Sequence, residues 1–322
     1  MNRCLSAALI LCAALAVQPA TAQDWPAKPV RFLAGSTPGS VGDVVLRILG
    51  EQFQKQTGQP WILDYRPGAG GSIAAVATAQ SAPDGYTFGL INTGTLAISP
   101  YVFVKPPYDA LKDFTYVARM VQLNTVLWVR KASPFASVKD LVEFAKANPG
   151  KLNYASTGPG AVSHLGGVLL GLRSGTSSVH VPYKSTAASS TAVLSGEADF
   201  GFESLATALG HIKGGTARAL GVAGAARLTM LPDVPTLEEA GVPGVVLTSY
   251  FGAIAPAGVP RPIVERMAAV LQVALADPAT VKRLEDLTFG AAWSGPDDFR
   301  ALAESEIRRW GPIIESAGVP KQ

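Results

Sequence analysis

Short segments with the pattern of β-strands alternate with amphipathic segments from residue 29 to residue 314, and this alternation constrains the fold most strongly. Pro29–Ala34 carries Val30, Phe32 and Leu33, and after a glycine-rich loop Asp43–Thr57 has apolar residues at helical spacing. Strands that alternate with helices build sheets that contain parallel strands, because each helix returns the chain to the same sheet edge. The sequence therefore predicts an α/β fold.

The remaining expected elements follow the same alternation. Strands are expected at 61–65, 87–91, 125–129, 152–155, 179–181, 198–202, 217–222 and 247–254. Helices are expected at 72–80, 138–147, 163–172, 186–195, 262–276, 279–287 and 297–314. Two of these strands, in Tyr86–Gly94 and Leu152–Gly158, end in Thr-Gly, and this echo between the halves is consistent with two similar lobes that face each other across a cleft.

Residues 1–22 have the three parts of a secretory signal peptide. Arg3 supplies the positive charge, Leu5–Val17 is an apolar stretch too short to span a bilayer as a helix, and Ala20-Thr21-Ala22 is an A-x-A cleavage site. An uncleaved membrane anchor is the alternative reading of this segment. We expect cleavage after Ala22 and a protein of the bacterial periplasm.

Composition excludes several classes of protein. The chain has 322 residues, a net charge of +3, 16% charged residues and 48% hydrophobic residues, which is too apolar for a disordered chain and too weakly basic for a nucleic-acid binder. Both cysteines, Cys4 and Cys12, lie in the predicted signal peptide, so the mature chain has none and cannot form a disulfide scaffold. Leu11 makes Cys12 a poor lipoprotein attachment site, because a small residue is required there.

Two glycine-rich loops between a strand and a helix are candidate anion sites. Ser36–Asp43 and Ser156–Ser163 each combine glycines with hydroxyl residues just before a helix. The first turn of a helix offers unpaired N–H groups and a partial positive charge, so together the two loops can hold a carboxylate without an arginine. Asp43 is expected to cap the helix or contact the other lobe, because a carboxylate repels an anion. A structural turn with a simple cap is the alternative for either loop.

The predicted ligand-binding residues fall into three groups. The carboxylate is assigned to the two loops, through Thr37, Gly39, Ser40, Gly42, Ser156, Thr157, Gly158, Gly160, Ser163 and His164. The other end of the ligand is assigned to the strand end with Asn92, Thr93 and Thr95, for which a plain turn is the alternative. Glu203 is a candidate partner for a ligand amine or a residue of the rim, and Tyr183 and Tyr250 are expected either to cover the ligand or to pack.

No enzyme motif accounts for these residues. The sequence lacks a G-x-S-x-G elbow, an H-E-x-x-H zinc motif and a P-loop, and a G-x-G-x-x-G fingerprint that begins at Gly158 fails at Ser163. The histidines His164, His180 and His211 lack metal-ligand spacing, so neither a metal nor a cofactor is expected. The one enzyme alternative is an exported hydrolase that uses Ser163 and His164, but adjacent residues on a helix point about 100° apart.

A series of short motifs runs through nearly the whole mature chain in one order. They are WPAKPVR at 25–31, PGSVGD at 38–43 with Arg47, RPGAGG at 66–71, PDGYT at 83–87, YASTG at 154–158 with SHL at 163–165, HVPYK at 180–184, PDVPT at 232–236 with EAG at 239–241, and APAGVP at 255–260. In wording and order these motifs resemble the Bug-type extracytoplasmic solute receptors of the tripartite tricarboxylate transporter family.

The resemblance implies a type II periplasmic-binding-protein (Venus-flytrap) fold, in which each of two lobes is a mixed sheet flanked by helices. Residues 23–124 and 247–322 would form the first, discontinuous lobe and residues 125–246 the second. It also implies a monomer that binds a small carboxylate in the cleft and delivers it to membrane permease subunits. Backbone amides, hydroxyls and ordered water in the two loops would hold the carboxylate. A dicarboxylate, a tricarboxylate, an acidic amino acid and an aromatic acid all remain open as ligands.

The chain departs from the family pattern around the cleft. Ser40 stands where a second glycine is usual, Ala34-Gly35 replaces Pro-Phe, Ser185 replaces a glycine, and Tyr250 lies where a tryptophan is common. These changes leave the fold expectation intact and bear on the choice of ligand. A receptor that signals to a membrane kinase instead of feeding a permease is the alternative that the sequence cannot separate from transport.

Overall fold

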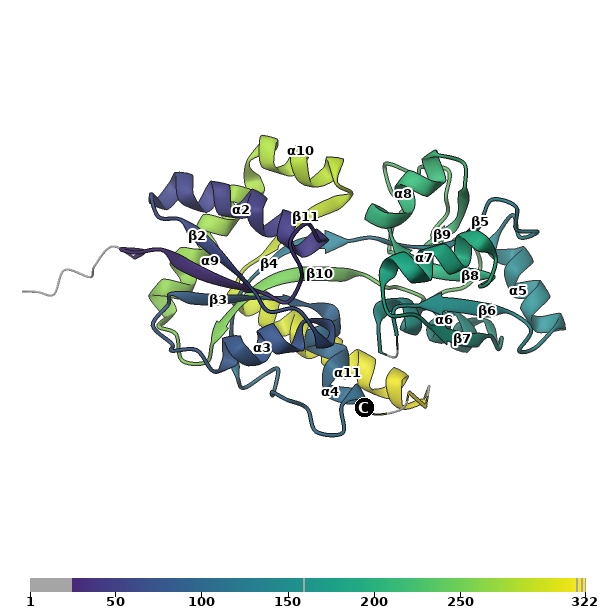
Figure 1. The fold of residues 1–322 in the computed structure, drawn as a ribbon, viewed down its shortest axis with the longest axis horizontal. Coiled ribbons are helices and arrows are strands. Elements are labelled where there is room, and N and C mark those ends of the chain that lie inside the picture. The colour runs from purple at the N-terminus through teal and green to yellow at the C-terminus, as the bar shows by residue number, and fades with distance from the viewer. Residues whose placement is uncertain (1–24, 159, 317, 320, 322) are drawn as a thin grey trace, which may run out of the picture.

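The computed structural model describes residues 25–158, 160–316, 318, 319 and 321. The predicted signal peptide and its cleavage site lie outside the described residues. Figure 1 shows two lobes side by side, each built around its own sheet. The α/β, two-lobed fold predicted from the sequence is confirmed.

The first lobe contains a six-stranded mixed sheet. Its strands are β1 (Val30–Ala34), β2 (Trp61–Tyr65), β3 (Thr87–Asn92), β4 (Phe114–Leu123), β10 (Ser249–Pro256) and β11 (Phe289–Ser294). Their order in the sheet is β11-β4-β10-β3-β1-β2. Strand β1 is parallel to β2 and β3, whereas β10 is antiparallel to β3 and β4, and β11 is antiparallel to β4.

The second lobe contains a five-stranded mixed sheet with a related arrangement. Its strands are β5 (Thr125–Arg130), β6 (Asn153–Ser156), β7 (Val179–Pro182), β8 (Phe200–Ser204) and β9 (Ala217–Val222), in the order β7-β6-β8-β5-β9. Strand β6 is parallel to β7 and β8, and β5 is antiparallel to β8 and β9. Both sheets thus place a parallel set of strands, with carboxyl ends that carry the predicted loops, next to antiparallel strands.

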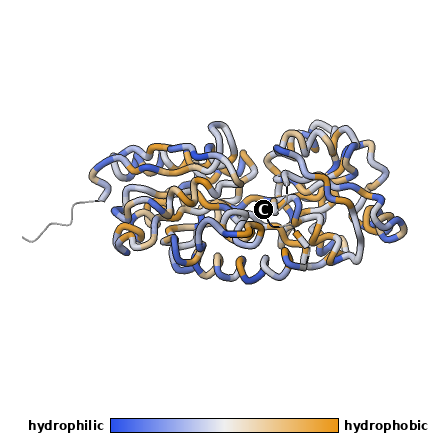
Figure 2. The backbone as a smooth tube through the Cα atoms, turned by 60° about the horizontal axis from the view of Figure 1, so that its bottom comes forward, coloured by the Kyte–Doolittle hydropathy of each residue, from blue (hydrophilic) through white to orange (hydrophobic). Residues whose placement is uncertain are grey.

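Helices flank both sheets. In the first lobe they are α2 (Val41–Thr57), α3 (Ser72–Ala79), α4 (Ser99–Val102), α9 (Arg261–Ala276), α10 (Pro278–Asp286) and α11 (Pro296–Ser316), with the short turns η1 (Ala69–Gly71) and η2 (Gly94–Ile98). In the second lobe they are α5 (Val138–Ala147), α6 (Val162–Ser174), α7 (Thr186–Ser195) and α8 (Leu205–Lys213). Each lobe combines hydrophobic and hydrophilic segments (Figure 2). None of the helices in the described ranges is long and apolar enough to cross a membrane.

Local sequence signals explain where several helices begin and end. Ser40 caps α2, with its Oγ accepting a hydrogen bond from the backbone N–H of Asp43, and Gly58 ends α2 in the left-handed conformation at φ 72°. Ser137 and Asp140 form a reciprocal capping box at the start of α5. Hydroxyl side chains and a terminal glycine satisfy the unpaired backbone groups at helix ends. Because these residues also mark the helix ends in the sequence, the observed boundaries agree closely with the predicted ones.

Four elements differ from the sequence expectation. Strands β4 and β11 and helix α8 were not expected, and the predicted loop at 92–95 is instead helical from Gly94 through Val102. Strand β4 is buried on both faces over most of its length, so its sequence lacks a clear alternation of apolar and polar residues. Helix α8 follows β8 directly, with Ser204 as its cap, so no loop signals its start.

Candidate functional site

Asp43 holds the loop between β1 and α2 in shape. Its Oδ2 accepts a hydrogen bond from the backbone N–H of Gly39 (2.7 Å), and its Oδ1 accepts from Arg47 Nε (2.9 Å) and Tyr65 OH (2.5 Å). Burial alone raises the pKa of a carboxyl group, but the bonds from Tyr65, Gly39 and Arg47 outweigh it and lower the pKa of Asp43. Asp43 is therefore an anionic anchor inside its own lobe.

Asp43→Asn is expected to lower the free energy of unfolding by about 2 kcal/mol at pH 7, because hydrogen bonds to a charged group are lost. Since the folded-state pKa is depressed, this stabilisation is present above the ordinary value of 3.8 and is lost as the pH falls through the folded-state value. Urea unfolding should therefore show a gap between wild type and variant that narrows toward pH 3. Asp84→Asn, at an exposed carboxylate that accepts from the N–H of Tyr86, is the control. A gap that does not change with pH would contradict this role.

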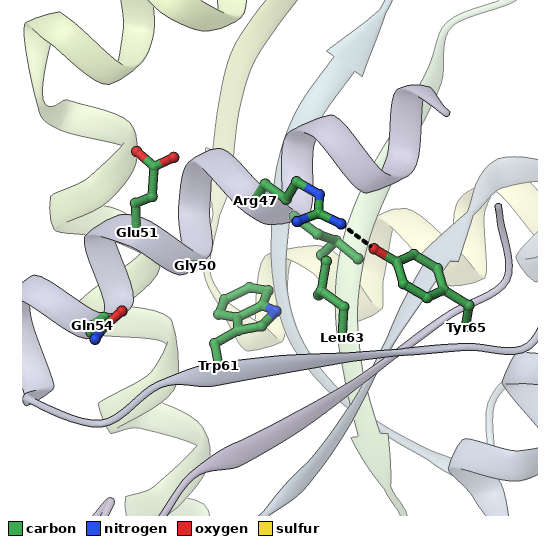
Figure 3. A pocket seen from close by; sticks show the side chains of 8 residues that line it. Arg47, Gly50, Glu51, Gln54, Trp61, Leu63 and Tyr65 are labelled. Carbon is green, nitrogen blue, oxygen red and sulfur yellow. Dashed lines mark hydrogen bonds between the residues drawn. The ribbon is translucent and has the colours of Figure 1, made fainter. Parts of the chain in front are cut away.

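Arg47 and Tyr65 also border a cavity of about 400 Å³ between α2 and β2. Figure 3 shows the Arg47 guanidinium turned toward the Tyr65 hydroxyl, with Leu63 below the pair and Trp61 to the lower left of Arg47. Arg47 donates a hydrogen bond of 2.7 Å to this hydroxyl. None of the predicted ligand residues lines this cavity. All of its lining residues lie on α2 and β2 of the first lobe, so this cavity is separate from the space between the lobes.

The loop between β6 and α6 has its own internal support. Ser156 is fully buried, and its Oγ accepts from the N–H of Gly158 (3.0 Å), while Ser163 Oγ accepts from the N–H of Thr157 (3.1 Å). Gly158 and Gly160 have φ values of 118° and 75°, which side chains rarely adopt. The described residues of this loop thus present backbone and hydroxyl groups at the N-terminus of α6.

A cavity of about 440 Å³ lies between the two lobes. It is lined from the first lobe by Ala69, Gly70, Asn92, Gly94, Ile98, Ser99, Val102 and Phe103, and from the second by Thr157, Gly158, Gly160, Ala161 and Val162. Among these described lining residues none is charged. We call this space the interlobe cavity. It brings together four of the predicted ligand residues, namely Asn92, Thr157, Gly158 and Gly160.

The other predicted residues lie elsewhere around the cleft. Thr37, Gly39, Ser40 and Gly42 lie on the first loop, outside the lining of the interlobe cavity. Ser163 supports the second loop by accepting a hydrogen bond from the N–H of Thr157. His164 lines a separate cavity on a different side of α6. The Ser163 hydroxyl bonds Thr157, and His164 Nδ1 accepts from the N–H of Gly160, so both groups of the hydrolase alternative are engaged with the loop and not with each other.

Thr93, Thr95 and Tyr250 are buried and engaged in packing. The Tyr250 N–H donates to Thr93 Oγ1 (3.2 Å), and Thr95 Oγ1 donates to the carbonyl of Gly70 (3.0 Å). The Tyr250 ring, 2% exposed, packs edge-on against Phe299 of α11. The structure therefore places these three residues in the frame of the cleft and not on the surface of the interlobe cavity.

Glu203 and Tyr183 do not line the interlobe cavity. Glu203 is buried on β8, where it accepts from Ser190 Oγ (3.2 Å) and the N–H of Ser204 (2.8 Å), and burial raises its pKa above the ordinary value. Tyr183 OH donates to Glu197 (2.9 Å) at the surface.

Sequence reasoning missed most of the first-lobe wall of the interlobe cavity. Ile98, Ser99 and Val102 lie on the helical segment that follows the predicted loop at 92–95, and Phe103 comes directly after it. The sequence analysis assigned no element to these four residues, and their apolar pattern carries no signal for a ligand. The RPGAGG motif carries no sequence signal for a ligand, but its glycines form the turn that contributes Gly70 to the wall.

The sequence matches the family described as "Tripartite tricarboxylate transporter family receptor" over residues 45–319. Protein BugT of Bordetella pertussis (strain Tohama I) is 31% identical over 301 residues, which cover 93% of this chain and 92% of BugT. Two solved structures are similar throughout. "R. palustris Rpa4515 with adipate" has a TM-score of 0.84 and 30% identity, covering 93% of this chain and 100% of that one. MatC from Rhodopseudomonas palustris "with bound malate" has a TM-score of 0.78 and 30% identity, with coverages of 90% and 100%. The resemblance seen in the sequence is therefore confirmed, and the chain belongs to the receptors of the tripartite tricarboxylate transporter family.

Proposed function

We propose that the protein is a periplasmic receptor that captures a small carboxylate between its two lobes and delivers it to a membrane permease. The observation that carries this proposal is the interlobe cavity, because residues of both lobes line it and the N-terminus of α6 opens at its wall. A site of this kind closes when the lobes move together around the ligand. Similar chains have been solved with adipate and with malate, which supports a carboxylate ligand.

The lining of the interlobe cavity favours a carboxylate with an apolar body. Polar groups come from Asn92, Ser99 and Thr157, whereas Ile98, Val102, Phe103 and Val162 contribute apolar surface to the same wall. A hydroxylated or triply charged acid would leave polar groups facing this apolar surface, which costs free energy. We therefore propose a linear dicarboxylate with a methylene chain as the preferred ligand class.

The lobes are proposed to hinge where the chain crosses between them. Strand β4 passes through Asn124 into β5, and the return passes beside Ala223, whose carbonyl accepts from the N–H of Leu247 (2.9 Å). We propose lobe boundaries at 23–124 plus 247–322 and at 125–246, which the positions of these crossings support. We propose that the mature chain begins at Gln23 after export and acts by binding and not by catalysis.

Calorimetric titration with a panel of acids tests this function. The panel contains adipate, malate, a tricarboxylate, an acidic amino acid and an aromatic acid, each at pH 7. We expect adipate or a similar linear dicarboxylate to bind at least tenfold more tightly than malate. If no member of the panel binds or raises the melting temperature, the carboxylate proposal fails. Tighter binding of the tricarboxylate would overturn the argument from the apolar wall.

A further inference from the structure

Two histidines fasten both ends of the loop between β6 and α6. The backbone N–H of Gly160 donates to His164 Nδ1 at 3.0 Å, and His180 Nε2 lies 2.5 Å from Ser156 Oγ. The two imidazole rings stack on each other with centroids 3.9 Å apart, and both stack near the Tyr154 ring. The three rings come from three different elements: Tyr154 lies on β6, His164 on α6 and His180 on β7.

The three rings do not border the interlobe cavity. His164, His180 and Tyr154 line a separate cavity of about 510 Å³, which shares no lining residue with the interlobe cavity. Gly160, in contrast, lines the interlobe cavity. His164 therefore acts on the wall of the binding site through Gly160 and not by direct contact with a ligand.

The bond to Gly160 fixes the protonation state of His164. Because Nδ1 accepts a hydrogen bond, it carries no proton, and the neutral ring holds its proton on Nε2. An imidazolium has only donors, so protonation at Nδ1 would set two N–H groups against each other and release Gly160. The Ser156 hydroxyl can donate or accept, so the contact with His180 tolerates either state of that ring.

The surroundings keep the pair neutral. Burial, with repulsion from His180, lowers the pKa of His164 to about 4, and burial also lowers the pKa of His180. The titratable groups that face the pair in the described elements packed against α6 are Tyr154, whose pKa is raised by burial, and the two histidines themselves. Glu203 of β8 bonds Ser190 of α7 on the opposite face of the sheet from α6, so it does not stabilise an imidazolium here.

We propose that His164 and His180 are positioning residues of the binding site, which hold Gly160 and Ser156 in the positions that receive the ligand. The effect of the pair on ligand binding rests on the proposed function. As long as His164 is neutral, its hydrogen bond with Gly160 is kept and the binding site keeps its shape. The site is then insensitive to mild acid.

Nuclear magnetic resonance of the unliganded protein tests the geometry directly. In ¹⁵N-labelled protein we expect His164 to show the Nε2–H tautomer at pH 7 and to titrate near pH 4, and we expect the Gly160 amide resonance to move with the same midpoint. His211→Gln assigns the third imidazole, which lies on α8 away from the loop. Titration of His164 near 6.5, or a Gly160 amide that does not respond to it, would overturn the proposal.

Variants that keep or remove the acceptor test the consequence for binding. His164→Ala should weaken adipate binding at pH 7 about tenfold, whereas His164→Asn, which keeps an acceptor at the position of Nδ1, should stay within about threefold of wild type. His180→Gln is the matching conservative change, and His211→Ala is the control. Equal losses for His164→Ala and His164→Asn, or no loss for His164→Ala, would contradict a positioning role. If wild type binds no acid, the proposed function fails, while the resonance experiment still decides the arrangement of the pair.

Discussion

Gly160→Val is expected to weaken ligand binding at least 100-fold. A Cβ at Gly160 would lie 2.9 Å from Val102 Cγ1 and 3.5 Å from Ile98 Cγ2, so a valine would push α4 of the first lobe away from the loop of the second. The same side chain would fill part of the interlobe cavity, which Gly160, Val102 and Ile98 line together. Because a Venus-flytrap receptor gains affinity by closing on its ligand, a wedge at this contact removes both the space and the closure.

Gly175→Val is the control that distinguishes obstruction of the cleft from backbone strain. Gly175 has a φ of 68°, close to the 75° of Gly160, but a Cβ there would meet no heavy atom within 4 Å. Both variants therefore pay about 1–2 kcal/mol for a side chain in the left-handed region, whereas only Gly160→Val obstructs the cleft. Calorimetry should show near-wild-type affinity for Gly175→Val. Equal affinities for the two variants would show that Gly160 does not border the ligand.

Phe299→Ala is expected to lower the free energy of unfolding by about 3–5 kcal/mol, because it leaves a cavity in a fully buried site. The Phe299 ring is 0% exposed and meets the rings of Tyr116 and Tyr250 edge-on, at centroid distances of 5.2 and 5.7 Å. A Cβ at Gly252 would lie 2.2 Å from this ring, so the backbone of β10 packs directly on it. Phe299 thus joins α11 to β4 and β10, the strands next to the lobe crossings.

Urea unfolding measures this loss, with Phe144→Ala as the control. The Phe144 side chain of α5 is 41% exposed, so its removal should cost less than about 1.5 kcal/mol. A loss at Phe299 no larger than that at Phe144 would mean that the site beneath α11 relaxes to fill the space.

The parts of the fold that the sequence predicted are those with local signals. Strand β2, helix α5, helix α7 and strand β9 have the expected bounds, because hydroxyl caps, terminal glycines or compact apolar runs mark them. Strand β4 escaped prediction because its apolar residues are dictated by burial on two faces and not by a period. The helical turn at Gly94–Ile98 depends on Asn92 Oδ1, which accepts from the N–H of Thr95 (2.9 Å), a short-range contact with no distinctive pattern.

The candidate site was predictable to the same extent. Glycine and hydroxyl residues before a helix indicated the loop that presents Thr157, Gly158 and Gly160, because the free N–H groups at a helix N-terminus can bind an anion. The opposing wall at 98–103 is set by the packing of η2 and α4 on α11 within the first lobe, for which a single sequence carries no signal. His164 was assigned to the ligand, whereas its Nδ1 is occupied by Gly160, and only the three-dimensional positions of β6, β7 and α6 bring His180 beside it.

The central claim is that a carboxylate binds between the lobes against the 156–160 loop. A crystal structure of the protein with the tightest-binding acid of the panel tests it most directly. We expect closed lobes, with one ligand carboxylate within hydrogen-bond distance of the first-turn amides of α6 or of the Thr157 hydroxyl, and with the ligand body against Val102 and Phe103. A ligand bound outside the interlobe cavity, such as in the cavity between α2 and β2, would contradict it.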